Sequence, residues 1–282
     1  MSDENKIRDA ADAVKGIVEA VPIYQDVAQP AVREIGIALQ TVAKTIHVAL
    51  APFSALVWGY EQLNDFLSTK VAEKLKDVPP ENIVTPKPNV AGPALQSLRF
   101  TGHEETLRDM YANLLAASMD TRTATGAHPA FVEIIRQLTP DEARLICLIA
   151  QDRAFPLVTV RREYKVETPL ERGGMEVLVH FSLLGWEAGC DFPQMTPTYL
   201  DNLCRLGLAV IPTISEYTKP GIYDSLEKHP QVELAKASIE ADEKWRAAVY
   251  RKGLQVTQFG MQFCRICVVS HDQKGLPKST PT

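Results

Sequence analysis

A pair of cysteines near the C-terminus has the spacing of a metal site. Cys264 and Cys267 are separated by two residues, and His271 follows after three more. Zinc sites use such spacings, but a structural zinc needs four ligands, and no second cysteine pair lies nearby in the sequence. Apolar residues surround both cysteines, as in a helix that faces a core. The sequence therefore predicts buried thiols here, without a bound metal and without a cofactor.

Two histidines are the candidates for acid–base chemistry. His103 is followed by two acids but lacks the second histidine of a zinc-protease helix, and His128 directly precedes Pro129. Both are typical of hydrogen-bonding residues at helix starts, where either could be buried. No nucleophile elbow, phosphate-binding glycine loop or paired-carboxylate signature occurs in the sequence. We therefore predict that the protein is not an enzyme. The alternative is a hydrolase-type toxin with an unrecognised site near His103 and His128.

Two short basic clusters are the candidates for contact with nucleic acid. They consist of Arg161 and Arg162, and of Arg251 and Lys252. A phosphate-binding surface would need these four side chains on one face. The net charge of −5 and the pI near 5.7 argue against a protein that mainly neutralises phosphates. Nucleic acid is therefore not a predicted partner, and a winged-helix nucleic-acid-binding regulator is kept as an alternative function.

An apolar helical stripe between residues 30 and 67 is the element around which the sequence is organised. Apolar residues recur there in alternating steps of three and four, which places them on one side of an α-helix. No formal charge occurs from Thr45 to Tyr60. Pro52 lacks an amide donor and clashes with the preceding turn, so we expect the helix to kink or break there.

A helix surface so poor in charge must be covered by a protein core, a partner helix or lipid. We favour self-association, and hence a homo-oligomer, or core packing. A lipid interface is the alternative, because Trp58 and Tyr60 suit a headgroup boundary. The uncharged run is shorter than the roughly 20 residues that span a bilayer. The predicted membrane- or partner-contacting residues are Val32, Ile35, Leu39, Val42, Ile46, Phe53, Leu56, Trp58, Tyr60 and Leu63.

The predicted fold class is mainly α, with a C-terminal winged-helix-like α+β module. The expected regions are long N-terminal amphipathic helices in residues 1–78, a proline-rich linker in 79–93, a helical middle domain in 94–152, a winged-helix-like domain with a helical insertion in 153–269, and a disordered tail in 270–282. The linker rests on five prolines, which disfavour both helix and central strand.

Local signals place individual elements within these regions. Thr139, Pro140 and Glu142 form a capping-box pattern that starts a helix. β-Branched residues after Pro156 predict a strand, and Gly207 is expected to end a later helix. A charged helix is predicted over roughly residues 231–250. This order of helix, strand and final helix is the order of winged-helix modules, with a helical insertion at the wing.

The cysteines and the N-terminus predict the compartment. The five cysteines are odd in number and mostly in apolar surroundings, which fits reduced thiols better than disulfides. The N-terminal residues carry early acids and no apolar core, unlike a signal peptide. We therefore expect a cytoplasmic protein, with peripheral membrane attachment on activation.

Three stretches of the sequence resemble a known protein family. They are DVAQPAVREIGIALQTVAKTIHVALAPFSALVWGYEQLNDFL, PPENIVTPKPNVAGPALQSLRFTGHEETLRDMYANLLAASMD and HPAFVEIIRQLTPDEARLI. These stretches are similar to the abortive infection alpha (Abi-alpha) family of bacterial proteins, and the likeness extends more weakly to the helix after Val256. The resemblance implies a role in antiphage defence, in which an infected cell becomes dormant or dies. It supplies no agreed catalytic residues.

The resulting hypothesis is a bacterial defence protein that acts by interaction and not by catalysis. The N-terminal apolar helices are its expected effector. The expected partners are further copies of the chain and a protein of the phage or of a neighbouring gene, with a membrane as the alternative target.

Overall fold

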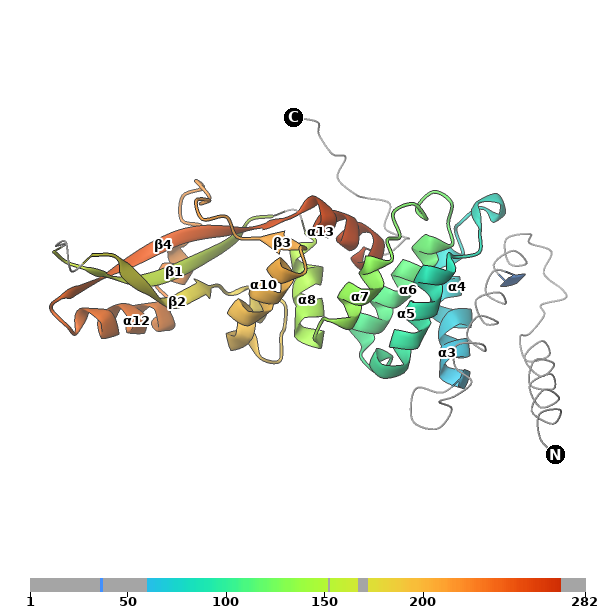
Figure 1. The fold of residues 1–282 in the computed structure, drawn as a ribbon, viewed down its shortest axis with the longest axis horizontal. Coiled ribbons are helices and arrows are strands. Elements are labelled where there is room, and N and C mark those ends of the chain that lie inside the picture. Colours follow the sequence, from blue (N-terminus) through green and yellow to red (C-terminus); the bar gives the residue numbers. More distant parts are fainter. Residues whose placement is uncertain (1–35, 38–59, 152, 167–171, 270–282) are drawn as a thin grey trace.

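The computed structural model describes residues 36–37, 60–151, 153–166 and 172–269. Within them the protein is mainly α-helical and has one four-stranded antiparallel sheet, so the predicted predominance of helix is confirmed. Most of the helices gather at one end of an elongated molecule. The long strands of the sheet extend from them toward the other end (Figure 1).

The first helical run of the described structure continues without a break through residues 60–75. It consists of α3 (Tyr60–Phe66), the π-helical η1 (Leu67–Val71) and α4 (Ala72–Leu75). Its buried side chains repeat the three–four spacing of the apolar stripe: Leu63, Phe66, Leu67, Val71 and Leu75. This run packs against helices that follow it in the chain. The C-terminal end of the stripe is therefore part of the protein core.

A helix begins inside the predicted linker. After the 3₁₀ turn η2 (Pro80–Asn82), α5 (Pro88–Thr101) starts with Pro88 at its first position and contains Pro93. An internal proline removes one backbone hydrogen bond, but α5 buries an apolar face that outweighs this loss: Val90, Ala91, Ala94, Leu95 and Leu98. The prediction of a linker is therefore wrong for residues 88–93.

Three further helices complete the helical end: α6 (Glu105–Ser118), α7 (Ala130–Arg136) and α8 (Pro140–Ile149). α6 is central, because it contacts α5, α7 and α8 and most of its side chains are buried. The capping box at the start of α8 is confirmed. The Glu142 N–H donates to the Thr139 hydroxyl at 3.2 Å, and the Thr139 N–H donates to the Glu142 carboxylate at 2.7 Å.

The sheet has the strand order β2-β1-β4-β3. Its strands are β1 (Phe155–Tyr164), β2 (Gly174–Phe181), β3 (Ala209–Val210) and β4 (Trp245–Val256). β1 and β4 pair along ten residues, from Phe155 opposite Leu254 to Tyr164 opposite Trp245. The strand predicted after Pro156 is thus confirmed. At its outer end, the centroids of the Tyr164 and Trp245 rings lie 4.1 Å apart.

Short helices connect the strands. α9 (Leu184–Glu187), η3 (Pro193–Met195) and α10 (Thr196–Arg205) lie between β2 and β3, and α11 (Asp224–Glu227) and α12 (Pro230–Glu240) lie between β3 and β4. Gly207 follows α10 with a φ of +73°, so it ends the helix as predicted.

The predicted helix over residues 231–250 is correct only to Glu240. The residues from Trp245 onward form β4 instead. β1 supplies backbone partners for them from Trp245 to Leu254. Tertiary pairing therefore overrides the helical pattern there.

The last described elements of the chain lie at the helical end of the molecule (Figure 1). α13 (Gln258–Phe263) leads into η4 (Cys264–Val268), which packs beside α6, where the Asn113 amide donates to the Cys267 carbonyl at 2.9 Å. The Phe263 ring meets that of Phe131 edge-on. One continuous core runs from α3 to η4 and crosses the predicted domain boundary between residues 152 and 153.

A second, smaller hydrophobic cluster lies on the sheet. It joins Val158 and Val160 of β1 to residues of the insertion between β3 and β4, among them Tyr223, Val232 and Ile239. α11 and α12 therefore cover one face of the sheet.

Several predicted features lie outside the described residues. They are the break at Pro52, the tail over 270–282 and the contact residues of the stripe other than Tyr60 and Leu63. Tyr60 begins α3, but its side chain is not among those described. Among the described residues, no helix is long and apolar enough to cross a membrane.

Candidate functional site

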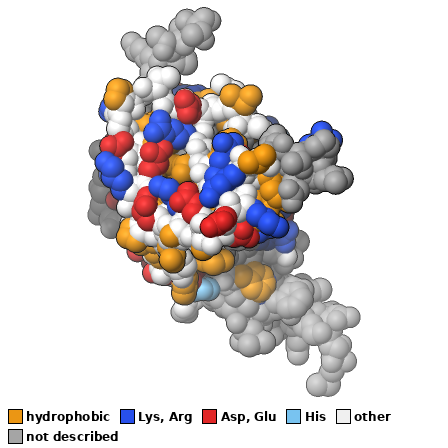
Figure 2. Space-filling model, turned by 90° about the vertical axis from the view of Figure 1, so that its left-hand side faces the viewer, with side chains coloured by type: hydrophobic (Ala, Val, Ile, Leu, Met, Phe, Trp, Pro, Cys, Tyr) orange, Lys and Arg blue, Asp and Glu red, His pale blue; other side chains and the backbone are white. Residues whose placement is uncertain are grey.

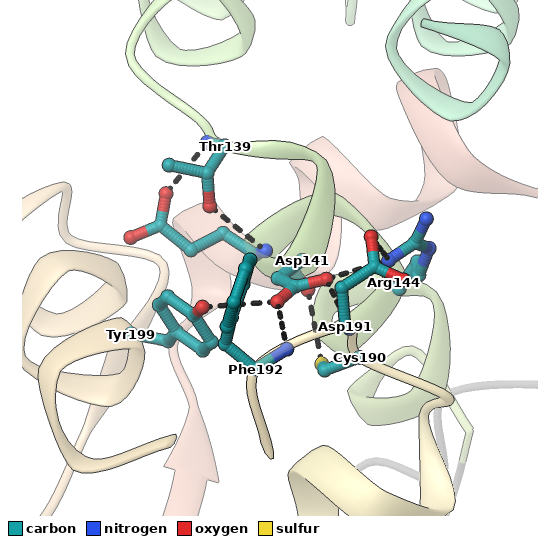
Figure 3. Close-up of polar contacts among 8 residues, drawn as sticks. Thr139, Asp141, Arg144, Cys190, Asp191, Phe192 and Tyr199 are labelled. Carbon is teal, nitrogen blue, oxygen red and sulfur yellow. Dashed lines mark hydrogen bonds and ion pairs between the residues drawn. The ribbon is translucent and has the colours of Figure 1, made fainter. Parts of the chain in front are cut away.

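A buried carboxylate at the start of α8 is the centre of a polar network in the helical end (Figure 3). Asp141 is 4 % exposed. Its Oδ1 accepts the Asp191 backbone N–H at 2.8 Å and a guanidinium N–H of Arg144 at 2.6 Å. Its Oδ2 accepts the Phe192 backbone N–H and the Tyr199 hydroxyl, each at 2.9 Å. Asp141 therefore ties α8 to both η3 and α10.

Neighbouring groups reinforce this connection. Arg144, one helical turn after Asp141, also donates to the Asp191 carboxylate at 2.8 Å. The Cys190 thiol lies 3.5 Å from the Asp141 carbonyl oxygen. On the other side, the Glu142 carboxylate of the capping box accepts the Asn202 amide at 2.8 Å. The first turn of α8 thus contacts α10 through two adjacent acids.

The electrostatics keep the network in one protonation state. Burial alone would raise the pKa of Asp141, but the N–H groups of Asp191 and Phe192, the Tyr199 hydroxyl and Arg144 together lower it. Burial, and then the bond to Asp141, raises the pKa of Tyr199 to about 12. Burial raises the pKa of the Cys190 thiol to about 11, and the Asp141 charge adds to this effect. At neutral pH the carboxylate is charged, and the phenol and thiol are neutral.

This arrangement suits a structural clamp better than a reaction centre. Four donors occupy the lone-pair positions of Asp141, so the carboxylate has no free position from which to accept a proton from a substrate. The neighbouring thiol is protonated, and thiols act as nucleophiles only as thiolates. What the clamp does is fix the segment from α9 to α10.

The fixed segment presents large apolar side chains to solvent. Phe192, whose backbone N–H is bound by Asp141, is 60 % exposed, and Trp186 and Met195 are also exposed. α9 is in close contact with η3 and with the start of α10, because a Cβ on Gly185 would lie 3.0 Å from Pro193 backbone atoms and 2.1 Å from the Thr196 hydroxyl. Aromatic side chains held on a rigid backbone are typical of protein contact surfaces.

Comparison with known protein families assigns the chain to one of them. Residues 59–267 match the family model described as "Abortive infection alpha". The match covers about three quarters of the 282 residues. The chain belongs to the abortive infection alpha family. Membership confirms the resemblance found in the sequence, and it suggests a role in abortive-infection defence.

Searches among individual proteins add little to the family assignment. No curated protein matches the chain. Among solved structures, an uncharacterized protein from the hydrocarbon-degrading marine bacterium Alcanivorax borkumensis SK2 is 21 % identical, with 52 % of this chain and 94 % of that chain covered. Its TM-score of 0.33 is too low to establish a shared fold.

The abortive infection alpha match includes the clamp but starts near the end of the apolar stripe. Asp141, Arg144 and Tyr199 lie within residues 59–267, whereas the stripe residues from Val32 to Trp58 precede them. Leu63 lies within the match and is fully buried in the core. The structure therefore corrects its prediction as a membrane- or partner-contacting residue.

The four basic residues that were candidates for contact with nucleic acid lie on both faces of the sheet. Strand pairing places Arg161 and Lys252 on one face and Arg162 and Arg251 on the other. Arg251 is paired with Glu227 at 2.6 Å, and the Lys252 ammonium lies 3.7 Å from the Glu176 carboxylate.

The surface around these residues carries mixed charge. At the end of the molecule formed by the sheet, Lys and Arg alternate with Asp and Glu (Figure 2). The fold therefore does not place the four basic side chains on one face.

The two histidines of the hydrolase alternative are exposed, and no described contact joins them. The His103 side chain is 67 % exposed and lies 3.6 Å from the Glu104 carboxylate. His128 is exposed, and its Nδ1 accepts the Ala130 N–H at 3.1 Å at the start of α7. The expectation that either could be buried is wrong, because each histidine caps or flanks a helix start at the surface.

The C-terminal cysteines are buried thiols, as predicted. Cys264 and Cys267 lie in the core, and burial raises the pKa of Cys264 to about 12. All five cysteines of the chain are free. Among the described residues, no three His, Cys, Asp or Glu side chains are placed to hold a metal ion, and His271 lies beyond them.

A polar hollow of about 280 Å³ lies beside Arg251. Its wall is the loop from Glu216 to Gly221, together with Tyr223 and Asp224. Two acids and two bases line it, so it has no preference for one sign of charge.

Sequence reasoning missed Asp141 as a functional candidate. The sequence presents it only as the second residue of a helix, where an acid is expected from the helix dipole. Its partners come from about fifty residues later in the chain. The signal present in the sequence was Tyr199 on the apolar side of a short helix, where a buried hydroxyl needs a polar partner.

Proposed function

We propose that the protein takes part in bacterial antiphage defence by abortive infection and acts by interaction without catalysis. The observation that carries this proposal is the family match over residues 59–267. The effector is the N-terminal apolar segment, and the binding target is another copy of the chain, a phage or neighbouring-gene protein, or a membrane. In this proposal the protein acts in the cytoplasm and attaches to a membrane on activation.

The position of Leu63 and Leu67 supports a role for the apolar segment in packing. Both residues continue the stripe, and both are buried. The segment before them repeats the same pattern with fewer charges. A surface of this kind is covered in water by more protein, either of the same chain or of a second copy. Self-association and core packing are therefore preferred to lipid.

Protein contact is also the preferred role of the C-terminal module. The order α8, β1, α9, α10, β3 and β4, with β4 between β1 and β3, is consistent with a winged-helix-like arrangement. In the position of a recognition helix, the η3–α10 segment exposes Phe192, Met195 and Asp201. Apolar and acidic side chains favour a protein over a phosphate backbone.

Two alternatives follow from the sequence and receive less support. A winged-helix regulator would need four basic residues on one face, but they are divided between the two faces of the sheet: Arg161, Arg162, Arg251 and Lys252. A hydrolase-type toxin would need a polar pocket that contains both His103 and His128, and no described contact links them.

The experiment that tests the proposal is a plaque assay. Cells that express the chain together with its neighbouring genes are challenged with a broad panel of phages. We expect fewer plaques, or growth arrest on infection, than in cells with an empty vector. Normal plaque numbers across the panel, with expression confirmed, would contradict a defence role.

A further inference from the structure

His180 occupies an unusual position between the sheet and α10. It lies in β2, where two residues oppose Thr159 of β1 in a bulge, and its φ is +49°. Its N–H donates to the Thr159 hydroxyl at 3.2 Å. Non-glycine residues seldom adopt a positive φ, so the bulge directs the ring at the expense of local strain.

Charged groups from three elements face the ring. The His180 Nε2 lies 3.5 Å from the Lys252 ammonium of β4, and its Nδ1 lies 3.9 Å from the Asp201 carboxylate of α10. Glu176 of β2 lies 3.7 Å from the same ammonium. The His180 side chain is only 17 % exposed, and its Nδ1 makes no hydrogen bond in the described structure.

The neutral ring fits this environment in one tautomer. An ammonium has only donors, so the nitrogen that faces Lys252 must be the unprotonated one. The proton then resides on Nδ1, which points toward Asp201 at a distance too long for a hydrogen bond. A second proton on Nε2 would remove the acceptor and bring two positive charges together.

We propose that His180 is a pH-sensitive joint between the sheet and α10, whose ring exchanges Lys252 for Asp201 when it becomes protonated. The charged ring repels the Lys252 ammonium toward Glu176 and attracts the Asp201 carboxylate. The exchange alters how α10, which carries both Tyr199 and Asp201, is held on the sheet. This inference is independent of the defence role.

The sign of the effect on stability follows from the balance of these groups. Burial lowers the pKa of His180 below its ordinary value of 6.5 and Lys252 lowers it further, whereas Asp201 and Glu176 oppose this shift. The folded protein therefore binds fewer protons than the unfolded chain. The stability contributed by His180 is complete above pH 6.5 and is lost as the pH falls through the folded-state pKa.

NMR titration of the histidine side chains tests the joint directly in the full chain. We expect a pKa for His180 below 6.5 and, at neutral pH, a proton on Nδ1. Lys252→Met should raise that pKa because it removes the repelling charge, and Asp201→Asn should lower it because it removes an attracting one. A ring that lies away from both charges in solution would respond to neither variant. A wild-type pKa at or above its ordinary value, the opposite tautomer, or a pKa that neither variant moves would overturn the proposal.

Thermal unfolding provides a second readout. His180→Asn removes the titrating group, and asparagine tolerates a positive φ. Between about pH 8 and about pH 5, we expect the wild type to lose more of its melting temperature than this variant. His128→Asn, at an exposed site, is the matched control and should follow the wild type. Parallel pH profiles of wild type and His180→Asn would refute the joint. If that variant does not fold, the Lys252 and Asp201 titrations decide the question.

Discussion

Asp141 and its buried hydrogen bonds should contribute strongly to the free energy of unfolding. Its carboxylate is buried with a full set of donors, and removal of a charge from such a network leaves several of them unsatisfied. We expect Asp141→Asn to lower the free energy of unfolding by about 3 kcal/mol. The control is Asp191→Asn, since Asp191 is mostly exposed and should cost less than about 1 kcal/mol. Urea unfolding at neutral pH measures both.

The pH dependence of the same variant gives a sign that can be checked. The pKa of Asp141 is lowered in the folded protein, so its contribution is present above the ordinary value of 3.8 and is lost as the pH falls through the folded-state pKa. The difference in stability between wild type and Asp141→Asn should therefore shrink in acid. Equal stability of the two proteins at neutral pH would show that the clamp contributes nothing.

At the residue scale, the sequence predicted local contacts and missed distant ones. The capping box at Thr139 and the helix end at Gly207 follow from neighbours within a few positions, and both are confirmed. The burial of Cys264 and Cys267 followed from the apolar residues around them. The contacts of Asp141 and His180 join residues far apart in the chain, so no local pattern could specify them.

At the scale of elements, α13 packs closely against the residue that precedes β3. Gly260 of α13 has no room for a side chain, because a Cβ there would lie 1.9 Å from the Leu208 carbonyl oxygen. We expect Gly260→Ala to destabilise the protein by about 2 kcal/mol, because the helix must move away from backbone atoms. Thermal or urea unfolding measures the change.

Gly92 of α5 is the matched control for that substitution. A Cβ on Gly92 meets no atom within 4 Å, and the residue lies inside a helix. Alanine there avoids the entropic cost of glycine, but its Cβ stands directly before Pro93, which disfavours helical geometry at that position. We therefore expect Gly92→Ala to change the free energy of unfolding by less than about 1 kcal/mol. Changes of the same sign and size at both glycines would contradict the packing described for α13.

Elements were predictable where pattern and packing agree. β1 and α8 were found because β-branched residues and a capping box indicate the structures that they form. The start of α5, residues 88–93, was missed because its prolines disfavour a helix, and only the apolar face that α5 buries against the core reverses that preference. The end of α12 was misplaced because pairing with β1 decides where β4 begins.

At the scale of the whole molecule, the family assignment and the apolar stripe lead to the same question. The match covers residues 59–267, and the part of the stripe that the structure describes is buried. Sequence alone gave the mainly helical class and the family. It could not show that one core joins the helical end to the C-terminal module, because that core depends on contacts between α6 and η4.

The central claim is that the apolar segment before α3 acts by contact with protein or lipid. Leu39→Asp combined with Ile46→Asp places two charges on the stripe, whereas Thr41→Asp combined with Thr45→Asp places two charges off it. Each pair is compared with the wild type for plaque formation on a phage that the wild type restricts.

If the stripe variant loses protection against phage, the size of the purified protein and its binding to liposomes show which of three causes applies. Core packing predicts an unfolded stripe variant, because buried unpaired charge is costly. Oligomer packing predicts a folded protein of smaller size. Membrane action predicts unchanged size with lost liposome binding.

Plaque formation is the measurement that tests the claim most directly. The account predicts that plaque numbers return to those of unprotected cells with the Leu39 and Ile46 pair and stay reduced with the Thr41 and Thr45 pair. Full protection by a folded Leu39→Asp, Ile46→Asp protein would contradict it.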